Sequence, residues 1–592
     1  MGGTQASKQR GHLRLANVHS SSATGRLHDG SGDSPARGCA LSNPILQLPT
    51  SSTCLGQPVT DRCSECVRRG REDENASPTT SQAGLVVNYT TDGNRTLLHN
   101  NSGHDPTADY EDTKSKVAAG GFGVVRMVTS RKTNTLCALK TVAKAGAPLM
   151  LLKREVEVNL VVDHPNVVRL YDVYEDRKNV YMVFEVCQGG ELLNTILKRK
   201  RFSESNAVFV SGQLLWALNY LHAKSIAHRD IKLENLLLKD KGVELSKNTV
   251  KLIDFGFAVR FAPGKADMKT MAGSAYYVAP EIIRRKKNEG YTEKCDVWSA
   301  GVVMYMLLTG GPPFGGSSEA AIIESVRRSN AKYDGREWSK VSEQTTSLVK
   351  SMLERDVPRR VSAAQAVMKW KEIPTSLPAS VPDEPTQAHF YERLQIFGTR
   401  SHFEQAARHL IARRLDEKTI QGLRNEFHKL DANGDGMLSL EEAKAGAGAA
   451  GFQDPTILEE MFAQIDTDGS DQIDYTEFLA AMLNRNLFTE AHAWEAFRVL
   501  DRDGDGVIDH SDLKAALGDA YQSEEPTASE TSSPMPTPRL AKRDQRKDTI
   551  QEMLQEADTN GDGTVDFQEF LAMVRRTSHG SAAPPTGPMS PA

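Results

Sequence analysis

The 592-residue sequence has few features of secreted or membrane-spanning proteins. Only seven cysteines occur and they are scattered, so we expect no disulfide framework and a reducing environment. The longest apolar run in the second half, VVMYMLL at 302–308, is far too short to cross a bilayer. The sequence also starts without the apolar segment of a signal peptide. These absences predict a cytoplasmic protein.

A strong charge of one sign is also absent. The formal net charge is -5 at pH 7, which argues against a nucleic-acid partner. Charged residues make up 25% and hydrophobic residues 39% of the chain, enough for globular cores. The length predicts three or four domains. We expect the protein to be a monomer.

Residues 1–108 have little hydrophobic periodicity, which predicts a disordered N-terminal tail. Two features of this tail leave alternatives open. Cys63 and Cys66 form a C-x-x-C pair that is either a zinc site or part of a solvated tail. The start MGGTQASKQR places Gly2 for N-myristoylation but has Ala6 where the pattern requires Ser or Thr. Gly2 is therefore either acylated, which gives weak membrane contact, or unmodified.

From about residue 110 the pattern changes to short strands and apolar-striped helices, among which several motifs follow in order. AAGGFGVV at 118–125 is rich in glycine, whose backbone can approach phosphates because no side chain blocks it. CALK places Lys140 on a predicted strand, where its ammonium can reach phosphates. Glu155, on the next predicted helix, can pair with Lys140. HRDIKLEN at 228–235 and DFG at 254–256 follow.

These motifs predict the groups that phosphoryl transfer needs, which are positioned cations and an aligned hydroxyl. Asp230 would accept the proton of the substrate hydroxyl, and Lys232 would neutralise the transferring phosphoryl group. Asn235 and Asp254 would hold magnesium. The predicted ATP-binding residues are Ala118, Gly120, Gly121, Phe122, Gly123, Val125, Lys140, Glu155, Glu185, Cys187 and Glu191.

Four stretches in the second half have the pattern of a calcium-binding loop of the helix–loop–helix type. The predicted ligands of the loops at 431–442 and 466–477 are Asp431, Asn433, Asp435, Met437, Ser439, Glu442, Asp466, Asp468, Ser470, Gln472, Asp474 and Glu477. Those of the loops at 501–512 and 558–569 are Asp501, Asp503, Asp505, Val507, Asp512, Asp558, Asn560, Asp562, Thr564, Asp566 and Glu569.

The four loops differ at the positions that decide affinity. The first and fourth have Gly at position six and Glu at position twelve, which predicts calcium binding. The second has Asp471 at position six, where a positive φ costs a non-glycine residue roughly 1–2 kcal/mol, so we expect weaker binding. The third ends in Asp512, which is one methylene shorter than Glu and favours magnesium over calcium.

A basic amphipathic helix is predicted between the two halves, within SHFEQAARHLIARRLDEKTIQGL. Its apolar face holds Phe403, Ala407, Leu410, Ile411 and Leu415, and Arg408, Arg413 and Arg414 lie off that face. Such a helix is a typical target of a calcium-opened groove, and the alternative is an ordinary helix packed on a neighbouring domain.

The motifs over 110–372, in this order, resemble the eukaryotic protein kinase family, and Lys232 indicates its serine/threonine branch. GSAYYVAPE and DVWSAGVVMYMLLTGGPPF are similar to the calcium/calmodulin-dependent group. The whole order over 110–577 resembles the calcium-dependent protein kinases of plants and protists. The resemblance implies ATP, Mg²⁺ and Ca²⁺ as cofactors. It also implies that the basic amphipathic helix between the two halves is a junction helix through which calcium relieves autoinhibition.

The fold class it implies is a two-lobed α+β kinase domain followed by an all-α EF-hand domain. The expected boundaries are a tail at 1–108, a kinase domain at 109–372, a linker and junction helix at 373–417, a calmodulin-like domain at 418–577 with an insertion at about 521–546, and a tail at 578–592.

Some residues modify these expectations. Ala118 replaces the first glycine usual in the family's loop, and Phe184 stands at the gatekeeper position. Glu191 and Glu234 are placed to meet a basic residue upstream of the target Ser or Thr in protein substrates. Thr270 is either a solvated threonine or a regulatory phosphorylation site. In the second case, Arg229 would bind the phosphate.

Two competing functions remain open at this stage. One is a calcium sensor or scaffold with an inactive kinase fold, against which the intact Lys140, Asp230, Asn235 and Asp254 argue. The other is a constitutive kinase whose loops only stabilise it.

Overall fold

The computed structural model describes residues 101–102, 105–120, 123–145, 148–270, 272–284, 289–374, 393, 396–397, 400–415, 417–449, 455–467, 469–484, 486–517 and 550–576. Gly2, Cys63, Cys66, the insertion at 521–546 and the C-terminal tail lie outside these residues, as does all but the end of the N-terminal tail. Among the described residues, no helix is long and apolar enough to span a membrane.

The N-terminal lobe of the kinase is a six-stranded sheet with strand order β1-β5-β6-β4-β3-β2. Its β-branched strands pair mostly antiparallel, and β4 lies between β3 and β6, where Lys140 faces Val125 and Met182 in register. The strands are β1 (Asn101–Ser102), β2 (Tyr110–Gly120), β3 (Gly123–Ser130), β4 (Leu136–Ala143), β5 (Leu170–Glu175) and β6 (Asn179–Glu185), and helix α2 (Leu149–Val161) follows β4.

The C-terminal lobe is mainly helical. Its helices are α3 (Leu192–Arg199), α4 (Glu204–Ala223), α5 (Pro280–Arg284), α6 (Lys294–Thr309), α7 (Glu319–Arg328), α8 (Glu343–Met352) and α9 (Ala363–Lys371). Helices α4 and α6 are apolar almost all round and are buried at its centre. The indole Nε1 of Trp370 donates to the carbonyl of Val208 at 2.8 Å, which fixes α9 on α4.

Short strands in this lobe hold the catalytic segments. β7 (Gly190–Glu191), β9 (Leu236–Leu238) and β10 (Val250–Leu252) form a three-stranded sheet with the order β10-β9-β7. β8 (Ile226–Ala227) pairs with β11 (Val259–Arg260). HRDIKLEN therefore lies between β8 and β9, and DFG lies between β10 and β11.

In its described residues, the EF-hand region consists of helices joined by loops with short bridging strands. Its helices are α11 (His402–Arg414), α12 (Glu417–Leu430), α13 (Leu440–Ala449), α14 (Pro455–Ile465), α15 (Tyr475–Met482), α16 (Glu490–Leu500), α17 (His510–Leu517), α19 (Ile550–Ala557) and α20 (Phe567–Arg575). β12 (Leu438–Ser439) of the first loop pairs with β13 (Gln472–Ile473) of the second. Ile508 of the third loop exchanges backbone hydrogen bonds of 2.9 Å with Val565 of the fourth. The loops thus occur as two pairs.

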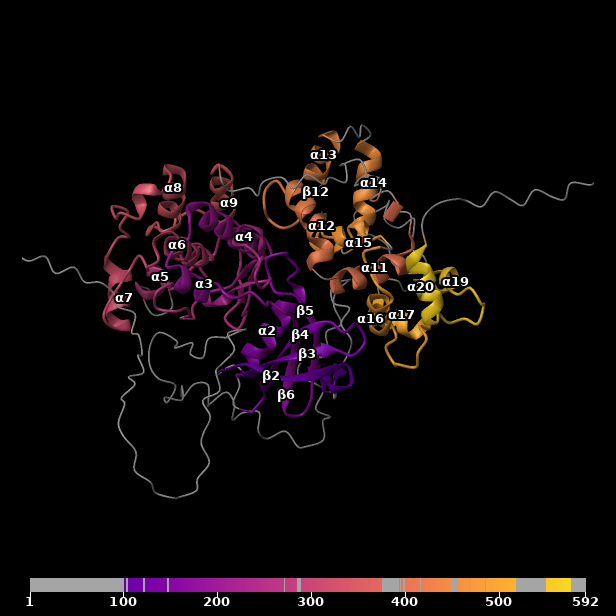
Figure 1. Cartoon of the computed structure of the whole chain (residues 1–592). Helices are drawn as coiled ribbons and strands as arrows, with labels where there is room; N and C mark the ends of the chain where they lie inside the picture. Colours follow the sequence, from indigo (N-terminus) through magenta and orange to yellow (C-terminus); the bar gives the residue numbers. More distant parts are fainter. Residues whose placement is uncertain are drawn as a thin grey trace, which may run out of the picture. The chain divides into compact units, whose positions relative to one another are not determined.

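The two helical regions have separate apolar cores. The core of the C-terminal lobe is built around α4 and α6, whereas the apolar face of α11 is buried in the core of the EF-hand region. Figure 1 shows α11 beside α16 and α20. The predicted fold class, a two-lobed α+β kinase followed by an all-α EF-hand domain, is confirmed.

Candidate active site and calcium loops

A buried ion pair joins the N-terminal sheet to helix α2. The Nζ atom of Lys140 on β4 lies 2.5 Å from Oε1 of Glu155 on α2, and both side chains are 7% exposed. Burial would lower the pKa of Lys140, but the carboxylates of Glu155 and Asp254 raise it. Lys140 therefore stays charged in a buried position, as an ATP-binding lysine must.

The catalytic loop holds Asp230 by hydrogen bonds from its own residues. Lys232 Nζ lies 2.5 Å from Asp230 Oδ2, and Asn235 Nδ2 donates to the carbonyl of Asp230 at 2.9 Å. From the activation segment, Ser274 Oγ donates to Asp230 Oδ1 at 3.1 Å. The structure thus places the predicted general base and the predicted phosphate-neutralising lysine side by side.

The residues expected to hold magnesium fit that role. Asp254 has φ = 68°, in the left-handed region that a non-glycine residue rarely adopts. Asn235 Nδ2 donates to the carbonyl of Asp230, but the buried Oδ1 of Asn235 accepts no hydrogen bond within the described structure. A buried amide oxygen without a donor fits a metal ligand, since leaving it unpaired costs free energy.

The predicted adenine pocket has one side chain in an unexpected role. Val125, Ala138, Val168, Leu237 and Ile253 line its apolar walls, with Phe184, Glu185, Lys140, Glu155 and Asp254 around them. Glu185 uses its carboxylate to bind Lys239 Nζ at 2.5 Å and Lys251 Nζ at 2.8 Å. The carboxylate of Glu185 is therefore already paired with two lysines, and Cys187 is buried, at 1% exposed.

The glycine-rich loop is only partly described. β2 ends at Gly120 and β3 begins at Gly123, whose φ is 127° and which pairs with Gly120 in the hairpin. Gly121 and Phe122 lie outside the described residues, and of Ala118 only the backbone is described. The structure therefore places the hairpin that contains the loop.

The acids expected to meet a basic substrate residue differ in exposure. Glu191 is buried, at 4% exposed, and accepts a hydrogen bond from Asn194 Nδ2 at 3.1 Å. Glu234 is half-buried, and Tyr277 Oη donates to its carboxylate at 3.3 Å. Burial raises the pKa of Glu234. Glu234 is the more accessible of the two.

The activation segment is tied to the catalytic loop through Arg229. Arg229 Nη1 donates to Tyr291 Oη at 3.1 Å, and Tyr291 Oη donates to the carbonyl of Thr270 at 2.8 Å. Arg229 therefore lies near Thr270, while the regulatory role of Thr270 stays a prediction. At the end of the segment, Arg360 pairs with Glu281, with contacts of 2.6 and 2.9 Å.

One residue that holds the catalytic loop was not assigned from the sequence. The buried carboxylate of Asp296 accepts hydrogen bonds from the backbone N–H groups of His228 at 2.9 Å and Arg229 at 2.7 Å. Asp296 belongs to the quoted stretch DVWSAGVV. The available signal was an acid at the start of an otherwise apolar helix, where a charged side chain needs a buried partner.

All four calcium loops share the same pattern of backbone hydrogen bonds. In each, the carboxylate at position twelve accepts from the backbone N–H of position nine, at 2.8 to 3.1 Å, and the residue at position nine caps the helix that follows. The position-nine residues are Ser439, Asp474, Asp509 and Asp566. A reciprocal pair of this kind stabilises the start of a helix and fixes the twelfth carboxylate.

The sharp turn at position six is present in every loop. Gly436, Gly506 and Gly563 have φ values of 74°, 96° and 86°, and Asp471 of the second loop has φ = 60°. The predicted positive φ at Asp471 is confirmed. This conformation costs a non-glycine residue free energy that the other loops avoid by having glycine there. Asp468 of the same loop lies outside the described residues.

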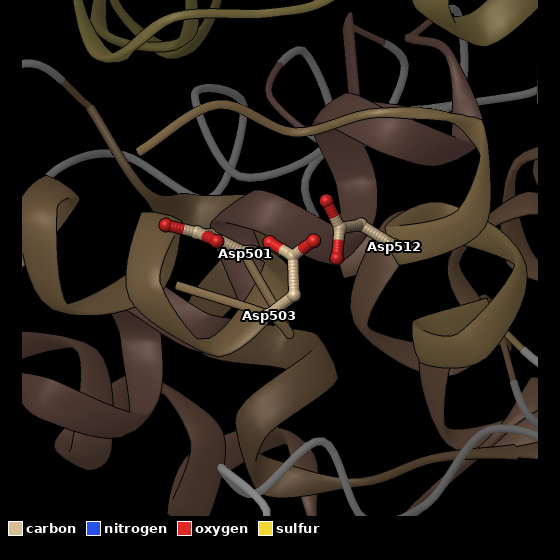
Figure 2. A group of neighbouring side chains, drawn as sticks. All are labelled: Asp501, Asp503 and Asp512. Atoms are coloured by element: carbon tan, nitrogen blue, oxygen red, sulfur yellow. The ribbon is translucent and has the colours of Figure 1, made fainter. Parts of the chain in front are cut away.

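In the third loop, acidic side chains converge (Figure 2). Asp501, Asp503 and Asp512 each present a carboxylate oxygen within 4.8 Å of the other two. In the first loop, burial and the neighbouring Asp435 raise the pKa of Asp431 to about 7. Converging carboxylates of this kind repel one another until a divalent cation neutralises them, so the donors fit calcium or magnesium.

We predict that the position-twelve residues rank the loops. Glu442→Gln and Glu569→Gln should each raise the calcium needed for half-maximal activity more than Asp512→Asn does. The reason is that the shorter Asp512 contributes less coordination at the start. Calcium titrations of phosphate transfer measure this, and equal shifts for all three variants would contradict the ranking.

The predicted junction helix is present as α11, and its basic residues have specific partners. Arg408, expected off the apolar face, is buried and donates to the carbonyls of Leu483 at 2.8 Å and Val574 at 2.9 Å. These carbonyls end α15 and α20. Arg408 therefore satisfies helix C-termini within the EF-hand region.

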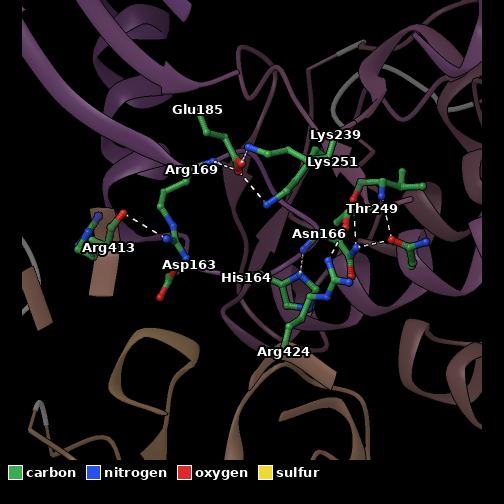
Figure 3. A network of polar contacts seen from close by, with 12 residues as sticks. Asp163, His164, Asn166, Arg169, Glu185, Lys239, Thr249, Lys251, Arg413 and Arg424 are labelled. Atoms are coloured by element: carbon green, nitrogen blue, oxygen red, sulfur yellow. Dashed lines mark hydrogen bonds and ion pairs between the residues drawn. The ribbon is translucent and has the colours of Figure 1, made fainter. Parts of the chain in front are cut away.

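The end of α11 meets the N-terminal lobe. Arg169 Nη1 donates to the carbonyls of Arg413 at 3.1 Å and Ala412 at 3.4 Å, and its backbone N–H donates to Glu185 at 2.9 Å. Figure 3 shows this chain of contacts, from Glu185 through Arg169 to Arg413. Arg169 thus caps the junction helix from the position just before β5, next to Val168 of the nucleotide pocket.

Comparison with known proteins agrees with this geometry. The Protein kinase domain model matches residues 111–370, and the EF-hand domain pair model matches residues 420–483 and 490–575. Calcium-dependent protein kinase 3 of Plasmodium berghei (strain Anka) is 33% identical over 471 residues, which cover 79% of this chain and 80% of that protein. Calcium-dependent protein kinase 8 of Arabidopsis thaliana is 31% identical over 536 residues, covering 88% of this chain and 93% of that protein. The chain therefore belongs to the calcium-dependent protein kinase family.

Proposed function

We propose that calcium binding to the EF-hand loops relieves autoinhibition of the kinase by holding the junction helix α11 within the EF-hand region. The chain is a serine/threonine protein kinase that uses ATP and Mg²⁺ and binds Ca²⁺ through its EF-hands. The observation that carries the proposal is the position of α11. Its apolar face is buried among EF-hand helices, while its last residues contact β5 of the kinase.

The catalytic groups define the steps that the chain itself performs. Asp230 accepts the proton of the substrate hydroxyl as the hydroxyl oxygen attacks the γ-phosphorus of ATP. The bond between the γ-phosphorus and the oxygen that bridges it to the β-phosphate breaks, and ADP leaves. Lys232 balances charge on the transferring group, and Lys140 orients the α- and β-phosphates. Magnesium, held by Asn235 and Asp254, would neutralise phosphate charge when bound.

The energy needed for switching is within reach of four loops. Moving an equilibrium from 1:99 to 99:1 requires roughly 5.5 kcal/mol of differential binding. A tenfold preference for the active state at one loop supplies about 1.4 kcal/mol. Four such loops just suffice. If the second and third loops bind weakly, the first and fourth loops need a stronger preference for the active state.

The deciding experiment measures phosphate transfer from ATP to a basic peptide, with calcium and with a chelator. Calcium should raise the rate of the natural chain, and a Glu442→Gln, Glu569→Gln double variant should respond only at much higher calcium. The alternative is a calcium-binding scaffold whose kinase is not gated by calcium. Equal rates with calcium and with chelator would favour it.

We predict that the kinase prefers one Arg or Lys three residues before the target Ser or Thr. Glu234 is half-buried beside the catalytic loop and can meet such a side chain. Profiling with a peptide library should show this preference in the natural chain and its loss in Glu234→Gln. An acidic or proline-directed preference would contradict the assignment.

A cytoplasmic monomer is the simplest proposal, with membrane contact through Gly2 if that residue is acylated. Mass spectrometry of the N-terminal peptide from the native source tests the acylation directly.

A further inference from the structure

The first calcium loop lies against the C-terminal lobe of the kinase. Two kinase side chains bind the carbonyls of its first four residues. Lys371 Nζ, at the end of α9, donates to the carbonyls of Ala432 at 2.5 Å and Asp431 at 3.4 Å. Asn219 Nδ2, on α4, donates to the carbonyls of Gly434 at 2.9 Å and Asn433 at 3.4 Å. Every carbonyl from 431 to 434 thus has a donor in the kinase domain.

Close packing accompanies these hydrogen bonds. A Cβ atom on Gly434 would lie 2.7 Å from Val367 Cγ1 and 3.0 Å from Trp216 Cδ1. A Cβ atom on Gly436 would lie 2.6 Å from His164 Cδ2. Glycine is therefore required here by the kinase surface as well as by the turn, because any larger residue would collide with the C-terminal lobe.

The residues beside the loop continue this contact. Met437, at position seven, is part of the apolar core of the C-terminal lobe rather than that of the EF-hand region. On the entry helix α12, the ring of His428 stacks on Trp216 with 4.2 Å between ring centroids. The loop and its entry helix thus share one continuous surface with α4 and α9.

The third and fourth loops provide an internal comparison. Gly504, Gly506, Gly561 and Gly563 occupy positions four and six of those loops with similar positive φ values. A Cβ atom on any of them would meet nothing within 4 Å. The close packing of Gly434 and Gly436 against the kinase therefore does not follow from the general shape of a calcium loop.

The charge of Lys371 acts on the same site. Its ammonium contacts the loop that holds Asp431 and Glu442, both predicted ligands. A divalent cation in this loop would add positive charge close to an ammonium that is already in place. Like charges repel, and with water-like screening a unit charge about 6–12 Å from a divalent cation lowers the affinity for that cation by about three- to tenfold.

We propose that the kinase domain is part of the first calcium site, in which Lys371 and Asn219 hold the loop carbonyls and the charge of Lys371 lowers calcium affinity. Calcium binding in the first loop therefore weakens the contact of the loop with the C-terminal lobe, and that contact weakens calcium binding. This inference rests on calcium binding at the first loop, as in the proposed function, but not on calcium gating of the kinase. A readout of occupancy distinguishes the two.

The test is hydrogen–deuterium exchange of the full chain across a calcium titration. Lys371→Met keeps the packing and removes the charge, so half-maximal protection of residues 431–442 should require about three- to tenfold less calcium. Protection of residues 558–569 should be unchanged, and Lys371→Arg should behave like the natural chain. Lys369→Met, which removes the same charge two residues away on α9, should leave the first loop unchanged. Equal shifts for Lys369→Met and Lys371→Met, or no shift for either, would overturn the proposal.

A second pair of variants tests the contact without changing charge. Gly434→Ala and Gly561→Ala place the same residue at position four, at φ values of 70° and 78°, so the backbone strain is matched. Only Gly434→Ala collides with the kinase, and it should increase exchange of residues 363–371 in the presence of chelator. The same increase for Gly561→Ala, or none for Gly434→Ala, would show that the first loop does not dock on the C-terminal lobe.

Discussion

Replacing Lys140 by Met should lower phosphate transfer at least about a thousandfold, equivalent to about 4 kcal/mol of activation free energy. The substitution removes the charge that partners the buried carboxylate of Glu155 at 2.5 Å, and with it the ammonium that would orient the phosphates. Asp254→Ala should cause a similar loss because it removes a predicted magnesium ligand. Peptide phosphorylation at saturating calcium measures both effects.

Calcium binding should survive both substitutions. The apolar core of the EF-hand region is separate from the cores of the kinase lobes, so loss of the ion pair does not reach it. The matched control is Lys144→Met, just after the same strand, where Lys144 pairs with Glu175 at 2.7 Å. This control should keep most of the activity. A Lys140→Met protein with more than a hundredth of the natural rate would contradict the assigned role.

The second large effect is expected at the far end of the junction helix. Arg414 binds Asp172 of β5 through two hydrogen bonds, of 2.8 and 3.1 Å, and lies 3.3 Å from Glu495 of α16. Glu495 accepts a hydrogen bond from Ser130 Oγ at 2.7 Å, and Tyr110 Oη donates to Asp172. One arginine is therefore shared by two buried carboxylates at the contact between the N-terminal lobe and the EF-hand region.

Arg414→Ala should lower the calcium-stimulated rate at least about tenfold and leave the rate in chelator little changed. Breaking a buried pair by removing one partner costs about 3–5 kcal/mol, since the remaining charges stay buried. Part of that cost would weaken the contact between the end of α11 and the N-terminal lobe, which we propose supports the calcium-activated state. Phosphorylation rates with calcium and with chelator, together with thermal unfolding in calcium, measure the change.

Two comparisons make this prediction specific. Lys429→Ala removes an exposed pair with Glu426, which is worth roughly 0–1 kcal/mol, and should have little effect. Adding Asp172→Asn to the Arg414 variant removes one of the buried charges and should restore part of the rate. A calcium-stimulated rate unchanged in Arg414→Ala would show that this contact does not support activity.

The pair formed by Asp172 and Arg414 should not titrate near neutral pH. Burial alone would raise the pKa of Asp172, but Arg414 and the hydrogen bond from Tyr110 hold it below the usual value. A carboxyl with a lowered folded pKa contributes stability above its unfolded pKa of about 3.9, and this contribution is lost only as pH falls toward the folded pKa. The calcium response at pH 6 and pH 8 should therefore be equally sensitive to Arg414→Ala.

The fold class and most catalytic groups could be predicted because they are encoded locally. Lys140, Glu155, Asp230 and Asn235 lie in short motifs whose order already defines a kinase, and the calcium loops carry their ligands within twelve residues. The positive φ at Asp471 could also be predicted, because it follows from the loop pattern alone.

Contacts between segments distant in the sequence could not be predicted in this way. No local pattern relates Asp172 to Arg414, or Asn219 to the first calcium loop. Glu185 was assigned to ATP binding from the sequence, but the two lysines that bind its carboxylate, Lys239 and Lys251, lie on later segments that the fold brings back to the nucleotide pocket. Such pairings depend on how whole domains pack, for which periodicity gives no signal.

The pairing of the loops has a consequence for the shape of the calcium response. The bridge between Leu438 and Ile473 joins a favourable loop to the one strained at Asp471, and the bridge between Ile508 and Val565 joins the loop ending in Asp512 to a favourable one. Binding at one member of a pair orders the bridge and so lowers the entropy that its partner must lose. Calcium binding would then be positively cooperative within each pair, so the protein would respond to calcium more steeply than one with four independent loops.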